Sequence, residues 1–381
     1  MGMTRDDGID RQLEGEGAGG IAYRQAPPAI DAMRKAGAVP CVDGIMLPVE
    51  RMEEYFGNGL EKCTTNPALF EQAITSTDHF DGVIGSCARS GMSPDQTLWD
   101  HLMIPPVVQV ADRLRAAYES SYGMTGFVSL ELHPDYARDV RRSLDQAHEL
   151  IEKVGRPNLF IKVPATTEGL EVGRTLIGEG HHVNWTLIFT PEQMLEATRA
   201  SLVPGRPETV RSVLSVFVSR PDRDVNAILG KENDLDPEAV ALMQRMTPAI
   251  ASAKLCYQAW TDEIGGTGLF EGSTPRLLWA SLKANRAGDP LQYVSPLVGD
   301  YTVFTLPFET ANALVAAPPD AIRRNAVLED MELAREVVAC AKETIGFQGI
   351  LEGHVEAGCA SFSKAFAKLR GSVEQKMTQS A

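Results

Sequence analysis

The strongest constraint on the fold is a regular alternation between short apolar segments and longer amphipathic ones. Eight segments rich in β-branched and aromatic residues are typical of strands. They cover residues 40–45, 62–66, 127–132, 159–165, 182–189, 213–220, 276–282 and 301–307. Strands that alternate with helices form a parallel sheet, and eight of them can close into a barrel. We therefore predict an α/β fold, a (β/α)8 TIM barrel.

The segments between and after these strands carry helix signals. Thr190, followed by a proline and then Gln193, predicts a helix start with a capping box. One long helix is expected from Asp236 through Trp260. Two extra C-terminal helices, over 321–346 and 358–378, are expected after the last strand.

The expected organisation is a flexible, Gly-rich lead-in over residues 1–30 and a single barrel domain with a C-terminal helical extension over 31–381. The alternative fold is an open, doubly wound sheet. No GxGxxG motif follows any predicted strand, so the usual nucleotide site of that alternative is missing.

Charge and hydropathy narrow the possible partners. The chain carries a formal charge of −15, which disfavours binding to nucleic acid or to an anionic membrane surface. No apolar run approaches 18 residues, and the acidic start does not resemble a signal peptide. We expect a cytoplasmic protein, either a monomer or a homodimer.

The sequence contains no motif that predicts a metal site or a cofactor site. No two of the six cysteines are two or three residues apart, so they predict reduced, mostly buried side chains. The seven histidines are scattered, and only His181 and His182 are adjacent. Neighbouring residues on a strand point to opposite faces, so this pair does not predict a shared ligand site. We expect no metal and no cofactor.

Polar residues interrupt the predicted strands near their C-terminal ends. Buried parallel strands should be almost entirely apolar. The exceptions are Asp43, Asn66, Glu131, Lys162, Asn184, Thr186, Ser215, Arg220 and Ser281. In strand 182–189, alternation places residues 182, 184, 186 and 188 on one face, toward the barrel interior. A single one of these, such as Ser215, could be a hydrogen-bonded core residue, but together they predict an active site at the C-terminal mouth.

The residue types at this mouth support amine-based carbon–carbon chemistry. A lysine in a desolvated pocket is a usable nucleophile, and its natural product with a ketone is a Schiff base. Bond cleavage beside that imine needs an acid and a base, for which Asp43 and Glu131 are available. Asn66, Asn184 and Thr186 can hold hydroxyl groups or a water molecule. The iminium is itself the electron sink, so no metal is required.

The sequence contains other cationic side chains near or outside the predicted mouth. Lys254 is expected to pair or extend along a helix flank, whereas Lys283 is more exposed and suits a phosphate. The expected phosphate-binding set is Arg220, Lys283, Ser215 and Ser281. An ion pair with Asp222 or Asp224 is the structural alternative for Arg220.

Seven stretches in this order resemble the transaldolase family, in particular its longer bacterial type. They are TTNPALFEQAI (64–74), NLFIKVPATTEGL (158–170), VNWTLIFTPEQ (183–193), VFVSRPDRDVN (216–226), AKLCYQAW (253–260), RLLWAS (276–281) and YVSPLVGDYTVFTLPFET (293–310). Most specific is the Lys162 motif followed by Asn-x-Thr on the next strand.

The resemblance implies a role for each site residue. Lys162 is similar to the Schiff-base lysine, Glu131 to the acid/base glutamate and Asp43 to the aspartate of the first strand. Thr186 is similar to the threonine that helps hold a catalytic water. Asn66 and Asn184 are similar to the asparagines around the donor, and Ser215 and Arg220 to residues near the donor phosphate.

The resemblance also implies a reaction without a cofactor, in the pentose phosphate pathway of carbohydrate metabolism. A dihydroxyacetone unit would pass from sedoheptulose 7-phosphate or fructose 6-phosphate to glyceraldehyde 3-phosphate or erythrose 4-phosphate.

Two stretches depart from the family pattern. Gly-Ile-Met-Leu-Pro follows Asp43, where the family usually carries polar residues and an arginine. LKANRAGDP follows Ser281, in place of the usual Ser-Thr-Gly-x-Lys-Asn. Two alternatives therefore stay open: an aldolase that releases dihydroxyacetone or uses an unusual acceptor in a specialised pathway, and a non-catalytic sugar-phosphate binder.

Overall fold

The computed structural model describes residues 25–231, 234–267 and 274–380. Eight parallel strands form a closed barrel in the order β1 to β8, with β8 pairing with β1. They are β1 (Val39–Asp43), β2 (Cys63–Thr64), β3 (Val128–Glu131), β4 (Leu159–Pro164), β5 (His182–Ile188), β6 (Ser212–Phe217), β7 (Arg276–Ala280) and β8 (Thr302–Leu306). Each lies within one residue of a segment predicted as a strand, so the (β/α)8 barrel is confirmed.

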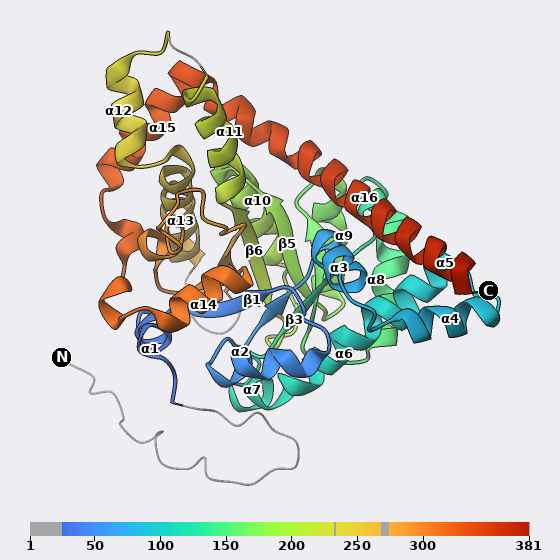
Figure 1. Cartoon of the computed structure of the whole chain (residues 1–381). Helices are drawn as coiled ribbons and strands as arrows, with labels where there is room; N and C mark the ends of the chain where they lie inside the picture. Colours follow the sequence, from blue (N-terminus) through green and yellow to red (C-terminus); the bar gives the residue numbers. More distant parts are fainter. Residues whose placement is uncertain (1–24, 232–233, 268–273, 381) are drawn as a thin grey trace.

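Helices surround the barrel, and a group of them extends it at the C-terminus (Figure 1). The first eight are α1 (Pro28–Lys35), α2 (Glu53–Gly57), α3 (Pro67–Thr75), α4 (Asp81–Arg89), α5 (Pro94–Gln96), α6 (Ile104–Arg113), α7 (Arg115–Ser120) and α8 (Val140–Val154). The others are α9 (Thr167–Gly178), α10 (Pro191–Ser201), α11 (Ser219–Leu229), α12 (Pro237–Arg245), α13 (Pro248–Thr267), α14 (Phe308–Ala316), α15 (Met331–Ile345) and α16 (Phe347–Ser380).

Local sequence signals explain several helix boundaries. Thr190 and Gln193 form the predicted capping box at the start of α10. The single long helix expected from Asp236 through Trp260 is wrong, because the chain leaves the helical conformation after Arg245 and begins α13 at Pro248. A proline lacks an amide hydrogen and disfavours helical backbone in the residue before it, so a new helix starts there.

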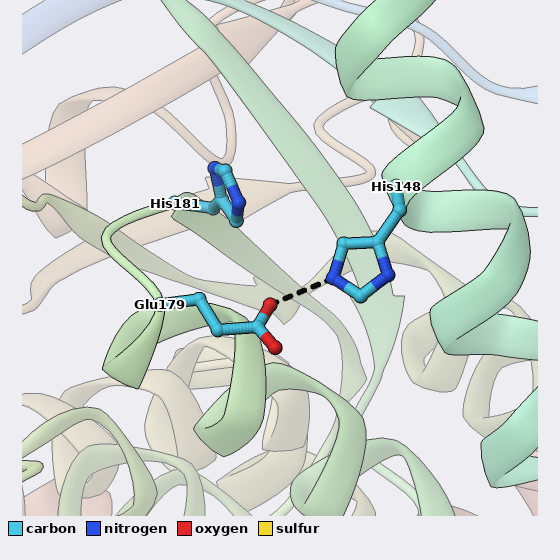
Figure 2. Close-up of side chains that lie close together, drawn as sticks. All are labelled: His148, Glu179 and His181. Carbon is cyan, nitrogen blue, oxygen red and sulfur yellow. Dashed lines mark hydrogen bonds and ion pairs between the residues drawn. The ribbon is translucent and has the colours of Figure 1, made fainter.

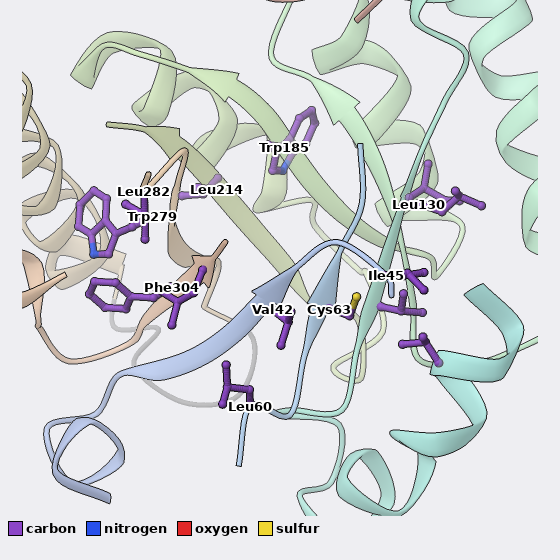
Figure 3. Close-up of a cluster of buried hydrophobic side chains, with 14 of the residues drawn as sticks. Val42, Ile45, Leu60, Cys63, Leu130, Trp185, Leu214, Trp279, Leu282 and Phe304 are labelled. Carbon is purple, nitrogen blue, oxygen red and sulfur yellow. The ribbon is translucent and has the colours of Figure 1, made fainter. Parts of the chain in front are cut away.

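Two apolar layers enclose the strands. Phe127, Phe160 and Val213 belong to the cluster inside the barrel, with the ring centroids of Phe127 and Phe160 4.3 Å apart. Residues of opposite parity, such as Leu130 and Trp185, pack outside the barrel against the helices (Figure 3). A fully buried leucine or phenylalanine of this kind contributes about 1.5–3 kcal/mol relative to its exposed state.

The expected alternation holds along most of β5 but fails at its end. The pairing with β6 shifts between Trp185 and Ile188, and Leu187 has a φ of 59°. Leu187 belongs to the inner cluster and Ile188 to the outer one, which is opposite to the predicted sides. The irregular backbone turns Leu187 toward the mouth of the barrel, where it contacts α16.

The C-terminal helix α16 crosses the barrel mouth and runs on along α3 and α4 (Figure 1). A Cβ atom built on Gly358 would lie 2.7 Å from the side chain of Leu187. A larger residue there would force Leu187 or the helix to move, so the glycine favours the close approach of α16 to β5 at the mouth. The sequence predicted a helix here, but nothing in the sequence indicated its path.

The predicted lead-in can be followed only from residue 25. Residues 1–24 lie outside the described residues, and α1 begins at Pro28, just before the predicted end of the lead-in. Among the described helices, none combines the length and the apolar character that crossing a lipid bilayer requires.

Candidate active site

The predicted polar residues gather around two adjoining cavities at the C-terminal mouth. The larger, of about 390 Å³, is lined by Asp43, Asn66, Lys162, Ser215, Arg220, Ser281 and Lys283, among others. The smaller, of about 30 Å³, is lined by Glu131 and Thr186 together with Lys162 and Asn66. Only Asn184 among the predicted residues lines neither. Side chains from all parts of the barrel therefore converge where the sequence placed a site.

Lys162 occupies the inner face of β4. The residue is 7% exposed, and its Nζ donates a hydrogen bond of 2.8 Å to the carbonyl oxygen of Thr65. In the register of the barrel Lys162 pairs with Glu131 on β3 and with Asn184 on β5. Phe160 precedes it by two residues and belongs to the apolar floor beneath it. The amine thus lies between an apolar floor and an open cavity.

Glu131 and Thr186 face Lys162 from the two neighbouring strands. Glu131 Oε2 accepts a hydrogen bond of 2.7 Å from Thr65 Oγ1. Its second oxygen, Oε1, and Thr186 Oγ1 are both buried and have no hydrogen-bond partner within the described structure. A buried polar atom without a partner is costly, and such atoms in an active site are available to substrate or water.

Asp43 lies at the end of β1 and lines the larger cavity. Thr64 Oγ1 donates to its Oδ1 at 2.8 Å. Burial raises the pKa of Asp43, an effect that the positive charge of Lys162 and the hydrogen bond from Thr64 partly offset. Burial also raises the pKa of Glu131, offset mainly by Lys162 and then by Thr65. Both carboxyl groups therefore hold a proton to a higher pH than exposed ones, which suits acid–base work near neutrality.

Asn184 and Asn66 have roles in building the site. Asn184 is fully buried; Nδ2 donates to Ser129 Oγ at 3.0 Å, and Oδ1 accepts from Ser215 Oγ at 2.6 Å. The expectation that Asn66 ends a strand is wrong, because β2 stops at Thr64. It is the N-cap of α3, where Oδ1 accepts from the amide of Leu69 at 3.1 Å. This cap fixes Asn66 at the wall of both cavities.

Arg220 lies at the start of a helix, and the prediction that places it in strand 213–220 is wrong. The strand β6 ends at Phe217, and α11 begins at Ser219. The Arg220 guanidinium lies over the rings of Phe217 and Phe362, 5.0 and 5.2 Å from their centroids. Burial lowers the pKa of the Arg220 guanidinium from 12.5, and the neighbouring charge of Arg223 lowers it further.

The alternative ion pair for Arg220 does not form. Asp222 accepts hydrogen bonds from the amide of Ala249 and the hydroxyl of Tyr293, both at 3.0 Å. Asp224 lies 3.2 Å from His354 Nε2 on α16. No carboxylate in the described ranges forms an ion pair with Arg220, so its hydrogen-bond donors are free to face the cavity.

Further cations lie on the same wall. Arg223, one turn after Arg220, lines the larger cavity and was not singled out from the sequence. Lys283 is exposed there, as expected. Ser281 does not end strand β7 but follows it with a φ of 56°, and its Oγ lies 2.9 Å from Ser219 Oγ. A local positive wall therefore exists in a chain whose formal charge is −15.

Two other lysines are buried away from this mouth. The sequence predicts that Lys254 pairs or extends along a helix flank, but it is buried instead. It is 2% exposed, and its amine donates hydrogen bonds to the carbonyl oxygens of Ala326 and Glu329. Lys62 precedes β2, at the opposite end of the barrel, and donates to the carbonyl oxygen of Met124 at 3.1 Å. Burial lowers the pKa of Lys62 to about 7. Burial alone therefore does not distinguish Lys162 from the other buried lysines as a candidate nucleophile. Its position at the mouth of the barrel distinguishes it.

The C-terminal helix supplies a part of the site that the sequence did not reveal. Phe362 lines both cavities, and Cys359 lines the smaller one. Neither residue belongs to a recognisable motif. Their role follows only from the path of α16 across the barrel.

Comparisons with known proteins agree with this arrangement. Residues 43–373 match the family described as Transaldolase/Fructose-6-phosphate aldolase. A protein of Thermobifida fusca (strain YX) named "Transaldolase" is 35% identical over 331 residues, which cover 82% of this chain and 88% of the relative. One from Trichodesmium erythraeum (strain IMS101) with the same name is 30% identical over 340 residues, covering 84% and 88%. "Transaldolase 1" of Streptomyces coelicolor is 32% identical over 333 residues, covering 82% and 84%.

Proposed function

Because the chain belongs to the Transaldolase/Fructose-6-phosphate aldolase family, we propose that it is a transaldolase and that Lys162 is its Schiff-base residue. The observation that carries this proposal is the arrangement around Lys162. A buried amine faces an open cavity and has a carboxyl group and a hydroxyl group, both with uncommitted oxygens, on the strands at either side. The enzyme transfers a ketol unit between sugar phosphates.

The first step is imine formation at the bottom of the cavity. Lys162 Nζ attacks the carbonyl carbon of the ketose, and the resulting carbinolamine loses water. Glu131 and Thr186 line the small cavity beside Nζ, and about 30 Å³ is enough for a single water molecule. Glu131 donates the proton that the leaving hydroxyl needs and takes it back when the imine is hydrolysed. Burial raises the pKa of Glu131, which favours proton donation by this carboxyl group relative to an exposed one.

The second step breaks the bond between the third and fourth carbons of the donor. Asp43 takes the proton of the hydroxyl on the fourth carbon, and the electrons of the broken bond flow into the iminium. Asp43 lines the larger cavity together with Lys162, on the side toward which the rest of the sugar extends. The aldose phosphate leaves, and an enamine of three carbons remains on Lys162 until an acceptor aldehyde reverses the step.

The phosphate end of the substrate is assigned to the cationic wall. Arg220, Arg223 and Lys283 line the larger cavity on its outer side, and Ser215 and Ser281 line the same cavity. Guanidinium groups bind phosphate oxygens through paired hydrogen bonds. Asn66 faces the donor hydroxyls, whereas Asn184 acts through Ser215, to which it is hydrogen-bonded. We propose sedoheptulose 7-phosphate or fructose 6-phosphate as donor, and glyceraldehyde 3-phosphate or erythrose 4-phosphate as acceptor, in the cytoplasm.

The distinguishing property of a transaldolase is that the three-carbon fragment waits for an acceptor. An aldolase protonates the fragment and releases it, for which lysine aldolases commonly use a tyrosine or a second lysine. No tyrosine is present among the described residues that line either cavity, and the second lysine there, Lys283, is exposed and is assigned to the substrate phosphate. Tyr301 precedes β8, at the far end of the barrel. The enamine is therefore expected to persist.

The test is a comparison of turnover with and without an acceptor. Fructose 6-phosphate alone should yield at most about one equivalent of glyceraldehyde 3-phosphate per site, the burst expected of a ping-pong enzyme. Addition of erythrose 4-phosphate should give sustained turnover and a seven-carbon ketose phosphate, identified by mass. Continuous release of free dihydroxyacetone without acceptor would instead identify an aldolase, and no release with any donor would indicate a non-catalytic binder.

A further inference from the structure

Two histidines and a glutamate from separate parts of the chain meet on the outer surface of the barrel. His148 projects from α8, whereas Glu179 and His181 lie on the loop between α9 and β5 (Figure 2). One potential ligand atom from each residue lies within 4.8 Å of the other two. Within the part of the chain that the structure describes, no other group of three histidine, cysteine or acidic side chains meets this geometry.

The cluster is remote from the active site. Glu179 and His181 precede β5, so they lie at the N-terminal end of the strand, whereas Thr186 lies toward its C-terminal end at the mouth. The proposed reaction uses none of the three residues. The side chains of His148 and Glu179 are 48% and 42% exposed, so an ion can reach them from solvent.

We propose that His148, Glu179 and His181 form a binding site for a divalent transition-metal ion, with Zn²⁺ as the expected occupant. Imidazole nitrogens select zinc, copper and nickel over magnesium and calcium, which prefer oxygen ligands. Two imidazoles and one carboxylate are a known zinc ligand set, with water completing four-coordination. The overall charge of −15 favours a cation at the surface.

Rotation of the side chains is enough to bring the three ligand atoms to the distances that a tetrahedral ion requires. Ligand atoms about 2 Å from a tetrahedral ion lie about 3.3 Å from one another. His148 Nε2 and Glu179 Oε2 are already 2.7 Å apart in a direct hydrogen bond. On binding, that hydrogen bond is replaced by two bonds to the ion, and the proton on His148 moves from Nε2 to Nδ1 through solvent. The ring centroid of His181 is 6.3 Å from that of His148, so a change in χ1 and χ2 brings its nitrogen to the ion.

The ion would connect two elements that otherwise meet through packing between α8 and α9 and through the hydrogen bond between His148 and Glu179. The helix α8 leads from β3 to β4, and the loop that carries Glu179 and His181 leads into β5. These three strands carry Glu131, Lys162 and Thr186. A metal bound here would stabilise the folded barrel without taking part in the chemistry.

The experiment measures Zn²⁺ binding to the full, metal-stripped chain, with its cysteines kept reduced. Isothermal titration should give one tight site per chain, and His148→Ala and His181→Ala should each weaken it at least tenfold. His79→Ala is the matched control, because His79 is also an exposed histidine but lies outside the cluster. A 100-fold excess of Zn²⁺ over its dissociation constant should raise the melting temperature by about 3 °C in the wild type. The shift should be lost in both cluster variants.

Co²⁺ supplies a readout that is independent of stability. It should give the visible absorption of a four-coordinate ion with nitrogen ligands in the wild type and in His79→Ala, but not in His148→Ala. Zn²⁺ binding that survives both cluster substitutions would place the site elsewhere, for example on the thiols, and overturn the proposal. Equal affinity for Mg²⁺ and Zn²⁺ would overturn it too, since it would mean simple attraction of cations to the surface.

Discussion

Glu131 and Lys162 are partners in the parallel register of β3 and β4, and both side chains point into the barrel. The charge of Lys162 opposes the effect of burial on the carboxyl group, so the two residues form one electrostatic unit. Because Thr65 accepts from Lys162 with its carbonyl and donates to Glu131 with its hydroxyl, it holds both in place.

Lys162 is expected to carry the covalent intermediate. Reduction with borohydride in the presence of fructose 6-phosphate should add one ketol unit to the peptide that contains Lys162, as measured by mass spectrometry. Lys162→Ala should remain unlabelled. Lys62→Met is the control: this second buried lysine lies at the opposite end of the barrel, so its removal should leave labelling intact. Label on any other lysine would remove Lys162 from its assigned role.

Glu131→Gln should lower turnover about 10²-fold or more, the usual loss when an acid–base group is removed. The Michaelis constant should change much less, because the side chain keeps its size and its position near Thr65. Thr186→Val should cause a smaller loss and Thr186→Ser should restore most of the rate, since the hydroxyl is the group proposed to hold the water. Steady-state kinetics measures all three. Unchanged turnover in Glu131→Gln would contradict the mechanism.

Arg220 is expected to bind the substrate phosphate. Arg220→Ala should raise the Michaelis constant for fructose 6-phosphate far more than that for unphosphorylated fructose. Arg220→Lys should recover little, because an ammonium group neither pairs with two phosphate oxygens nor offers a planar group to lie over the rings of Phe217 and Phe362. Equal effects on both sugars would show that Arg220 has only a structural role.

Phe362 is expected to act on phosphate binding by positioning Arg220. A cation–π contact contributes about 0.5–2 kcal/mol, which corresponds to about a 2- to 30-fold change in affinity. Phe362→Ala should therefore raise the Michaelis constant for phosphorylated donors within that range and leave the maximal rate nearly unchanged. Phe362→Tyr keeps the ring and should behave like the wild type. A loss of maximal rate alone would mean that the ring serves to exclude water instead.

Lys62→Met is expected to stabilise the fold most at pH 7 and below. Burial lowers the pKa of Lys62 from 10.5 to about 7, so the folded chain binds this proton less tightly than the unfolded chain. The charged lysine therefore costs stability below about pH 7, and the cost fades as the pH rises toward 10.5, where the unfolded chain loses the proton as well. The difference between 10.5 and about 7, at about 1.36 kcal/mol for each pKa unit, limits this cost in the free energy of folding to about 5 kcal/mol.

Melting temperatures from pH 6 to pH 10 measure this effect. The gap between Lys62→Met and the wild type should be largest at pH 6 and should narrow steadily with rising pH. Lys283→Met, a change at an exposed lysine, should show no such trend. A gap that is constant with pH would mean that Lys62 is not destabilised by burial.

The sequence by itself determined the barrel and the position of the residues proposed to form the centre of the active site. Eight apolar segments separated by helices allow few other folds, and each segment overlaps one strand of the structure. Lys162 and Glu131 could be placed because side chains on a regular strand alternate strictly, so their inward direction follows from local geometry. The capping box at Thr190 is equally local.

Features that depend on the meeting of distant segments were decided only by the tertiary structure. Regular alternation fails at Leu187, where the approach of α16 at Gly358 accompanies a left-handed backbone. Phe362 joins the active site because of the path of that helix. His148 comes to within hydrogen-bonding distance of Glu179, 31 residues away, because α8 packs against α9. Such contacts arise from packing between elements, which carries no periodic signal in the chain.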